Sequence, residues 1–252
     1  MTRTTKFLVF GAAPLALLLL TGFQAATKKA APAGPVDPIV AGFKKSTVAS
    51  VADAVDQIIG QRGFMDHTMR PRIPGQVVGR ARTAYVRKSS AAESTPAAAV
   101  KHSVEMIEDS KPGEVGVIVM EDGLNVAALG GLMATVAKAR GMAGVVTDAG
   151  VRDLAEIRAL GLPVYSRSVI PSTAVSRYVT VSRDTEVDCA GVKVNSGDII
   201  VAGEDGVVVV PKDRAAEVLK RSQEIDEREM NMVPFIKQFR SLTKAIEKFN
   251  RI

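Results

Sequence analysis

The residue pair with the clearest chemical potential in this sequence is Arg152–Asp153, which follows an apolar run and precedes a short helical pattern. Arginine is a permanent cation whose planar guanidinium can grip a carboxylate or an enolate oxygen at two points. Aspartate is a hard oxygen ligand of the kind that suits magnesium or manganese. Held at a strand end opposite a glycine-rich helix start at Gly130, the pair predicts a site for a small oxyacid on a metal ion. The alternative interpretation is a surface ion pair.

Hydrophobic periodicity predicts a single α/β domain around this pair. Short runs of branched aliphatic residues alternate with helical patterns, and Gly or Pro residues end many of them. In the helix expected over 131–140, Leu132, Val136 and Ala139 should face the core. The predicted strands are 76–87, 115–120, 143–147, 162–166, 178–182, 186–189, 192–194, 198–202 and 206–210. The other predicted helices are 97–110, 153–160 and one that Thr47 or Ser50 caps and that ends at Ile59.

The C-terminal part is predicted to be helical. A long polar helix is expected from Asp213 onward, and Pro234 should break it because proline lacks an N–H group and clashes with the preceding turn. The tail over 226–252 is amphipathic and carries a set of large apolar side chains: Phe235, Ile236, Phe239, Leu242, Ile246 and Phe249.

An ordered set of motifs resembles one known family. It comprises Gly130–Gly131–Leu132–Met133, Arg152–Asp153 with Glu156, Ala143–Asp148, Leu162–Tyr165, Gly197–Ile200 and Glu204–Pro211, with Val51–Ala54 and Val78–Ala81 upstream. Over residues 45–225 the sequence resembles the RraA-like family. That family includes regulator of ribonuclease activity A and the class II 4-hydroxy-4-methyl-2-oxoglutarate aldolases.

The resemblance implies a layered α/β/β/α swivelling sandwich, commonly assembled in trimers or hexamers with sites between subunits. It also implies a divalent-metal-dependent lyase acting on small 2-oxo acids through a pyruvate enolate, by retro-aldol cleavage, oxaloacetate decarboxylation or both. The same resemblance implies that Asp153 is the protein ligand to Mg²⁺ or Mn²⁺, and that Arg152 binds substrate and stabilises the enolate oxygen. The backbone amides of Gly130–Met133 then receive the substrate carboxylate.

One position departs from the family pattern. In the aldolases the residue twenty-one before the arginine is an aspartate that orients metal-bound water, whereas here it is Gly131. Asp153 is therefore the one carboxylate of the immediate motif, and weaker metal binding is expected. Glu156 remains as an anchor for a metal-bound water. The alternative function is a non-catalytic RraA-like protein that acts through protein contacts or oxyacid binding.

Other chemically capable residues are predicted to be structural. Asp148 fits a turn-stabilising role as well as a chemical one, and Glu204–Asp205 should form a hairpin turn. His67 and His102 are isolated, with no second ligand at a metal-like spacing. The single cysteine, Cys189, lies in a strand-like run and is expected to be a buried apolar residue.

Composition narrows the range of partners. The 252 residues carry a net charge of +6, but much of the basic excess lies at the two ends and is not interleaved with aromatic residues, which argues against nucleic acid. With no tryptophan and 4% aromatic residues, the core must be built from Val, Ile, Leu and Ala. The expected partners are a small 2-oxo acid and further copies of the chain, as a homotrimer or hexamer.

Residues 1–25 have the pattern of a secretory signal peptide, with basic residues, an apolar run and then small residues. A membrane anchor is the alternative, but the run is short and contains glycine and proline. Cleavage is expected within 22–26, followed by a flexible spacer over 26–44. The sequence thus predicts a periplasmic or secreted protein with no stable membrane anchor after processing.

Overall fold

The computed structural model describes residues 37–250. The predicted signal peptide, its cleavage region and most of the predicted spacer lie outside these residues and stay predictions. The described end of the spacer is helical, which corrects the expectation of an unstructured segment there: helix α1 spans Pro38–Phe43. The Asp37 carboxylate caps α1 by accepting a 2.9 Å hydrogen bond from Ile39 N, and it also pairs with Arg80 Nε at 2.7 Å. This ion pair links the start of α1 to the sheet, because Arg80 lies in the strand Val77–Lys88.

A nine-stranded mixed sheet forms the centre of the described chain, in the order β1–β6–β5–β3–β2–β10–β11, with β4 beside β5 and β7 beside β2. The strands are β1 (Arg70–Ile73), β2 (Val77–Lys88), β3 (Val115–Met120), β4 (Ala127–Leu129), β5 (Gly144–Val151), β6 (Val164–Val169), β7 (Tyr178–Arg183), β10 (Ile199–Gly203) and β11 (Gly206–Val210), and β8 (Val187–Cys189) pairs with β9 (Val192–Val194) separately. The helices are α2 (Val48–Ile59), α3 (Pro96–Glu108), α4 (Gly131–Ala139), α5 (Leu154–Leu160), α6 (Ala215–Phe239) and α7 (Leu242–Phe249).

The middle of the sheet is parallel and its flanks are antiparallel. Strands β2, β3, β5 and β6 run parallel to one another, whereas β1, β7, β10 and β11 pair antiparallel with their neighbours. Every residue of β3 is buried, as expected for a continuous apolar strand covered on both faces. The parallel strands therefore need covering layers on both sides.

One segment brings the two edges of the sheet together. Phe64 bridges to Val208 of the edge strand β11, and Met65 N donates to Val207 O at 2.9 Å. A few residues later, β1 pairs with β6 at the opposite edge. The sheet is therefore nearly closed upon itself.

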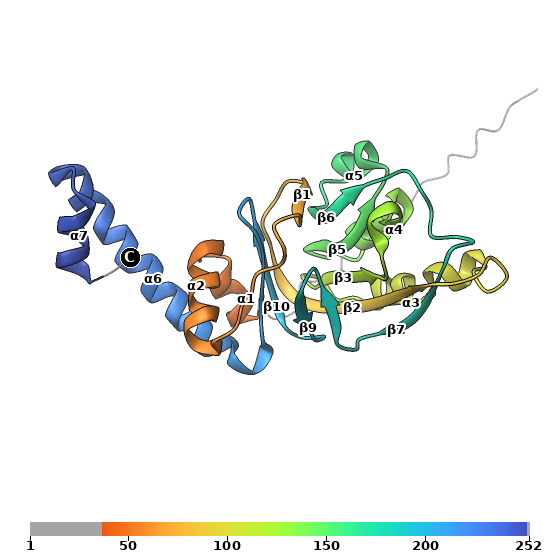
Figure 1. Ribbon diagram of the computed structural model, residues 1–252, viewed down its shortest axis with the longest axis horizontal. Coiled ribbons are helices and arrows are strands. Elements are labelled where there is room, and N and C mark those ends of the chain that lie inside the picture. Colours follow the sequence, from red (N-terminus) through yellow and green to blue (C-terminus); the bar gives the residue numbers. More distant parts are fainter. Residues whose placement is uncertain (1–36, 251–252) are drawn as a thin grey trace, which may run out of the picture. The chain divides into compact units, whose positions relative to one another are not determined.

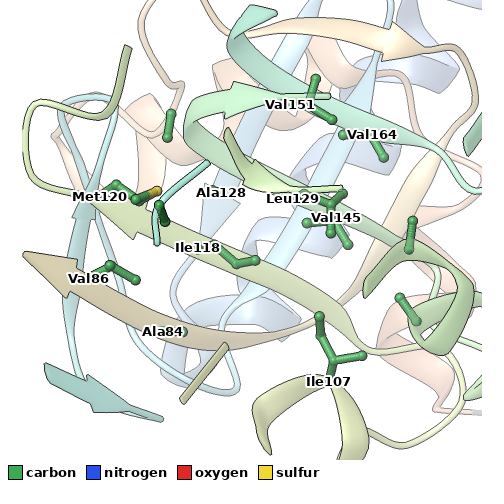
Figure 2. Close-up of a cluster of buried hydrophobic side chains, with 14 of the residues drawn as sticks. Ala84, Val86, Ile107, Ile118, Met120, Ala128, Leu129, Val145, Val151 and Val164 are labelled. Carbon is green, nitrogen blue, oxygen red and sulfur yellow. The ribbon is translucent and has the colours of Figure 1, made fainter. Parts of the chain in front are cut away.

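The curled sheet separates three clusters of buried apolar side chains. Adjacent strand residues face opposite sides, so Val117 and Val146 lie in the inner cluster while Ile118 and Val145 lie in an outer one. That outer cluster, part of which Figure 2 shows, is covered by α3, α4 and α5 (Figure 1). A second outer cluster, around Val201 of β10, is covered by α1, α2 and α6. The predicted α/β/β/α arrangement of a single domain is thus confirmed.

Helix α4 turns a different face to the core from the one predicted. Ala134 and Ala137 are buried, whereas Leu132 is 88% exposed and Val136 and Ala139 are also exposed. The prediction followed the largest apolar side chains of the helix. Helix α4 packs closely against α3 and α5. Alanine fits such close contacts, so the small residues form the buried side and the prediction is wrong.

The C-terminal tail is helical, as predicted, but the helix is not broken at Pro234. Helix α6 continues through this residue to Phe239. Pro234 is exposed, so water can hydrogen-bond to the carbonyl that the proline leaves without a partner. The helix ends instead at Arg240, which adopts a left-handed conformation with φ 50°, and the Ser241 side chain caps α7.

Candidate functional site

The ends of two parallel strands bring the predicted site segments together. Strand β4 pairs with β5, and Arg152 N donates to Leu129 O at 3.1 Å. Gly130 follows β4 directly, and Arg152 follows β5 directly. The carboxyl ends of parallel strands are where open α/β sheets bind their ligands. The glycine-rich segment and the Arg–Asp pair therefore lie at one edge of the sheet.

Asp153 is held against the start of helix α4. Its Oδ2 atom accepts a 2.8 Å hydrogen bond from Gly131 N, the first residue of that helix. Asp153 adopts the left-handed conformation, with φ 59° and ψ 40°, and its side chain does not cap its own helix α5. A carboxylate is stabilised near a helix N-terminus by the exposed N–H groups there. A strained backbone at such a position is a feature that gathers at functional sites.

Arg152 lies beside this carboxylate and remains accessible. Its nearest nitrogen, Nε, is 3.7 Å from Asp153 Oδ2. The two side chains are 41% and 43% exposed. The pair is thus a hydrated, loosely joined cation and anion that a small charged ligand can reach, rather than a buried structural ion pair.

The two glycines at the start of α4 differ in the room around them. A Cβ atom at Gly130 would lie 2.9 Å from Asp153 Oδ2 and 3.0 Å from Arg152 Nε, so any side chain there would displace both charged groups. A Cβ atom at Gly131 would lie 3.4 Å from Asp153 Cβ and 3.6 Å from Glu156 Cβ, which are ordinary contacts. A side chain at 130 would therefore disturb the Arg152–Asp153 pair, whereas the site has space for a larger residue at 131.

The hydrogen bond from Gly131 reduces the number of N–H groups that this helix start can offer to a ligand. The Gly131 N–H already binds Asp153, so the remaining first-turn donors for a ligand carboxylate are the N–H groups of Leu132 and Met133. Sequence reasoning misses this bond because it depends on the left-handed backbone of Asp153. The available signal is weak: aspartate adopts that conformation more readily than most residues other than glycine.

The donor set fits one kind of metal ion. Within residues 37–250 there is no group of three or more His, Cys, Asp or Glu side chains that could hold a metal. A zinc-type site needs three or four such ligands and is not supported. Magnesium usually keeps several waters and takes one or two carboxylates together with substrate oxygens. The single carboxylate of Asp153 is of the kind that such a site uses.

The other predicted candidates lie apart from this pair. Asp148 is in strand β5 rather than in a turn, which corrects its predicted turn-stabilising role; its Oδ1 accepts from Met120 N at 3.0 Å. Burial raises the pKa of this carboxyl to about 7. Glu204–Asp205 form the two-residue connection between β10 and β11, as predicted. Asp148 and the hairpin residues therefore do not join the Arg152–Asp153 site.

The histidines and the cysteine have structural surroundings. His67 is exposed, with Nδ1 3.5 Å from Asp66 Oδ2, and His102 lies on α3 with Nδ1 3.1 Å from Glu105 Oε2. Cys189 is buried in the inner cluster, and burial raises the pKa of its thiol well above the usual value. The predicted apolar role of Cys189 is confirmed, because a buried protonated thiol is a poor nucleophile.

Comparison with known proteins supports the family resemblance that the ordered motifs indicate. The Aldolase/RraA family model matches residues 48–209, more than half of the chain. The chain belongs to the RraA-like family. Among curated relatives of this RraA-like chain, a Halalkalibacterium halodurans protein named "Putative 4-hydroxy-4-methyl-2-oxoglutarate aldolase" is 30% identical over 183 residues, which cover 72% of the chain and 80% of the relative.

Solved structures share the same fold. An uncharacterised protein from Pseudomonas syringae superposes with a TM-score of 0.75 at 24% identity, covering 85% of the RraA-like chain and 96% of that protein. Streptomyces coelicolor RraAS2, described as an unusual member of the RNase ES inhibitor RraA family, superposes with a TM-score of 0.68 at 25% identity, covering 78% and 96%. The family thus includes proteins named as enzymes and proteins named as inhibitors.

Proposed function

We propose that this RraA-like protein is a divalent-metal-dependent lyase that cleaves 4-hydroxy-2-oxo acids of the 4-hydroxy-4-methyl-2-oxoglutarate type and decarboxylates oxaloacetate at the same site. The observation that carries the proposal is the placement of Arg152 and Asp153 together, accessible, against the first turn of α4. Relatives named as aldolases, such as the H. halodurans protein, support the reaction class.

Both reactions break a carbon–carbon bond next to the same 2-oxo group. In the retro-aldol reaction the C3–C4 bond breaks, its electron pair forms an enolate, and the C4 hydroxyl becomes a carbonyl as its proton passes to water. The enolate then takes a proton from water at C3 to give pyruvate. In oxaloacetate the same bond breaks with loss of carbon dioxide, which again leaves the pyruvate enolate. A site that stabilises negative charge on the enolate oxygen can therefore serve both reactions.

Each residue of the site has a separate role in this proposed reaction. Asp153, with Glu156 near it, would hold a Mg²⁺ or Mn²⁺ ion, which supplies positive charge next to the 2-oxo group. Arg152 binds the substrate through its guanidinium and stabilises the enolate oxygen. The first-turn N–H groups of Leu132 and Met133 donate hydrogen bonds to the substrate carboxylate. The left-handed backbone at Asp153 keeps its carboxylate on the side of α4.

A non-catalytic oxyacid-binding protein is the second candidate, and Gly131 is the observation that favours it. Without a carboxylate at this position, Asp153 is the one acidic side chain bonded to the start of α4. Arg152 and the helix start would then bind a small acid without turning it over. This candidate predicts that oxalate binds, as measured by calorimetry, while no pyruvate is released.

Release of pyruvate from oxaloacetate, with and without Mg²⁺ or Mn²⁺, tests the proposal. Asp153→Asn should reduce the metal-dependent rate roughly 100-fold or more, because it removes the charge that holds the cation. Arg152→Lys should be nearly as damaging, since a point charge cannot reproduce the two-point grip of a guanidinium. The fold should survive Asp153→Asn, because Asn Oδ1 can still accept from Gly131 N. It should also survive Arg152→Lys, because the Arg152 side chain is 41% exposed.

Asp205→Asn is the matched control, since Asp205 is an exposed acidic residue in a hairpin turn outside the site. It should keep the parent rate. Full metal-dependent activity in Asp153→Asn would rule out this site as the lyase centre. Circular dichroism spectra of all variants separate loss of activity from loss of fold.

A further inference from the structure

The corner between helices α6 and α7 is a feature that the proposed function does not use. Helix α6 packs against α1 and α2 in the domain and then continues to Phe239, after which α7 folds back along its end (Figure 1). This region lies beyond residue 209, where the family match ends. We call residues 239–242 and the side chains around them the C-terminal corner.

Aromatic packing holds the two helices together and fixes this corner. The ring of Phe235 lies 4.6 Å from that of Phe239 and 5.8 Å from that of Phe249, measured between centroids. Ala245 of α7 is fully buried. These contacts cover part of the apolar surface of the tail, whereas Phe239 and Leu242 at the corner and Met230 and Val233 farther back on α6 stay exposed.

The exposed part combines large apolar side chains with cations. Phe239, the last residue of α6, is 45% exposed, and Leu242, the first residue of α7, is 52% exposed. Lys244 Nζ lies 5.8 Å from the Phe239 ring centroid, and Lys248 Nζ lies 4.6 Å from that of Phe235. The exposed basic residues of this region are Lys237, Arg240, Lys244 and Lys248, against the single acidic residue Glu247.

We propose that the C-terminal corner binds the surface of an anionic lipid bilayer. Phe239 and Leu242 enter the boundary between headgroups and acyl chains, and the surrounding Lys and Arg side chains contact headgroup phosphates. A helical surface with apolar residues on one side and a basic flank is the type that lies in a membrane interface. Each basic residue near an anionic surface adds attraction that acts within a Debye length.

The association is peripheral. Across residues 37–250, no helix has both the length and the apolar character needed to cross a bilayer. Two half-exposed apolar side chains with four cations support reversible binding that depends on anionic lipid and weakens with salt. Such binding is compatible with the absence of a stable anchor expected from the sequence.

A second copy of the chain is a less suitable occupant for this surface. A stable interface covers on the order of 800 Å² on each partner. Two large side chains that are about half exposed offer roughly 200 Å² between them. The basic residues of one corner would also face those of the other corner in a symmetric dimer. Charge and area therefore both favour an anionic membrane over a second copy.

The absence of tryptophan from the sequence allows a direct test on the full chain. Leu242→Trp places a single fluorophore at the corner, at a position that is already exposed. Met230→Trp is the matched control, because Met230 is 70% exposed and lies on α6, the helix that carries Phe239. The two residues are nine positions apart, which places them about 13 Å apart along the helix and on opposite faces of it. A fluorophore at the corner reports on the corner itself, whatever other part of the chain contacts lipid.

Vesicles of phosphatidylglycerol and phosphatidylcholine should shift the emission of Leu242→Trp to the blue, and vesicles of phosphatidylcholine alone should not. Added salt should reverse the shift, and Met230→Trp should stay unchanged. Replacing Lys244 and Lys248 by Gln in the Leu242→Trp chain should weaken the response several-fold. The proposal is overturned if the Leu242→Trp emission does not respond to anionic vesicles. It is also overturned if the emission shifts with protein concentration without lipid, which would assign the corner to a second copy.

Discussion

At the scale of single residues, Gly131 is the position that bears most directly on the proposed metal site. The structure has room for a side chain there, since a Cβ atom would make ordinary contacts with Asp153 and Glu156. The aspartate of the family pattern would therefore fit at this position, and the presence of glycine instead has no steric cause. The position of the Arg–Asp pair at a strand end, opposite a helix start, is predictable from the sequence. The hydrogen bond from Gly131 to Asp153 is not, because it depends on a backbone conformation with positive φ.

Gly131→Asp should strengthen metal binding. The new carboxylate would lie close to that of Asp153, and the repulsion between the two is relieved when a divalent cation binds between them. Gly131→Asn is the matched control, with the same size and no charge. We expect Mg²⁺ to raise the Tm of Gly131→Asp by more than that of the parent or of Gly131→Asn. Equal shifts for Asp and Asn at this position would contradict a metal site beside Asp153.

Asp148 should make stability depend on pH. Burial raises the pKa of this carboxyl from its usual value near 3.8 to about 7, against the lowering effect of its hydrogen bond from Met120 N. Between these two values the folded chain holds a proton that the unfolded chain has lost, so the free energy of unfolding should fall as pH rises from about 4 to about 7. Urea unfolding across this range measures the effect.

Asp148→Asn should remove this component of the pH dependence. Asparagine keeps an acceptor for Met120 N and does not titrate. Asp205→Asn, at an exposed turn, should leave the dependence as it is in the parent. If the parent and Asp148→Asn lost stability equally between pH 4 and 7, another group would be responsible.

At the scale of elements, helices and strands are predicted best where a single feature of the sequence determines them. The apolar run of β3 is found where predicted, and α2 ends at Ile59, as predicted, before the left-handed Gly60. Short β1 and β4 are not predicted, because three or four residues carry too little periodicity and their pairing depends on β6 and β5. The buried face of α4 is mispredicted because close packing selects Ala134 and Ala137 over larger neighbours.

Pro234 should weaken the last turns of α6 without ending the helix. Proline in a helix interior costs about 3 kcal/mol relative to alanine. Pro234→Ala should therefore slow amide hydrogen exchange over residues 235–239, with little change in the rest of the domain. Gln238→Ala, at an exposed position on the same turn, should have a much smaller effect. Unchanged exchange in Pro234→Ala would mean that packing of α7, rather than the helix backbone, limits opening there.

At the scale of the whole molecule, the exposed side of α4 next to the site points to an assembly. Leu132 is 88% exposed, and with Val136 and with Val104 and Ile107 of α3 it borders a cavity of about 130 Å³. Leu132 follows Gly131 directly, so a neighbouring subunit covering this surface would also border the Arg152–Asp153 site. Exposed apolar surface of this kind marks interaction sites more often than free surface. The family resemblance, with sites between subunits, leads to the same expectation.

We therefore expect a homotrimer, or a hexamer made of two trimers, in solution. Leu132→Gln should shift the mass measured by light scattering towards the monomer and lower the lyase rate, because the subunit that shields the site from water is lost. Val181→Gln is the matched control, since Val181 is 45% exposed on β7, away from α4, and should keep both the assembly and the rate. A parent chain that is monomeric at about micromolar concentration would contradict the trimer, given that interfaces of standard size persist there. A trimer unaffected by Leu132→Gln would place the interface elsewhere and leave the Arg152–Asp153 site open on each subunit.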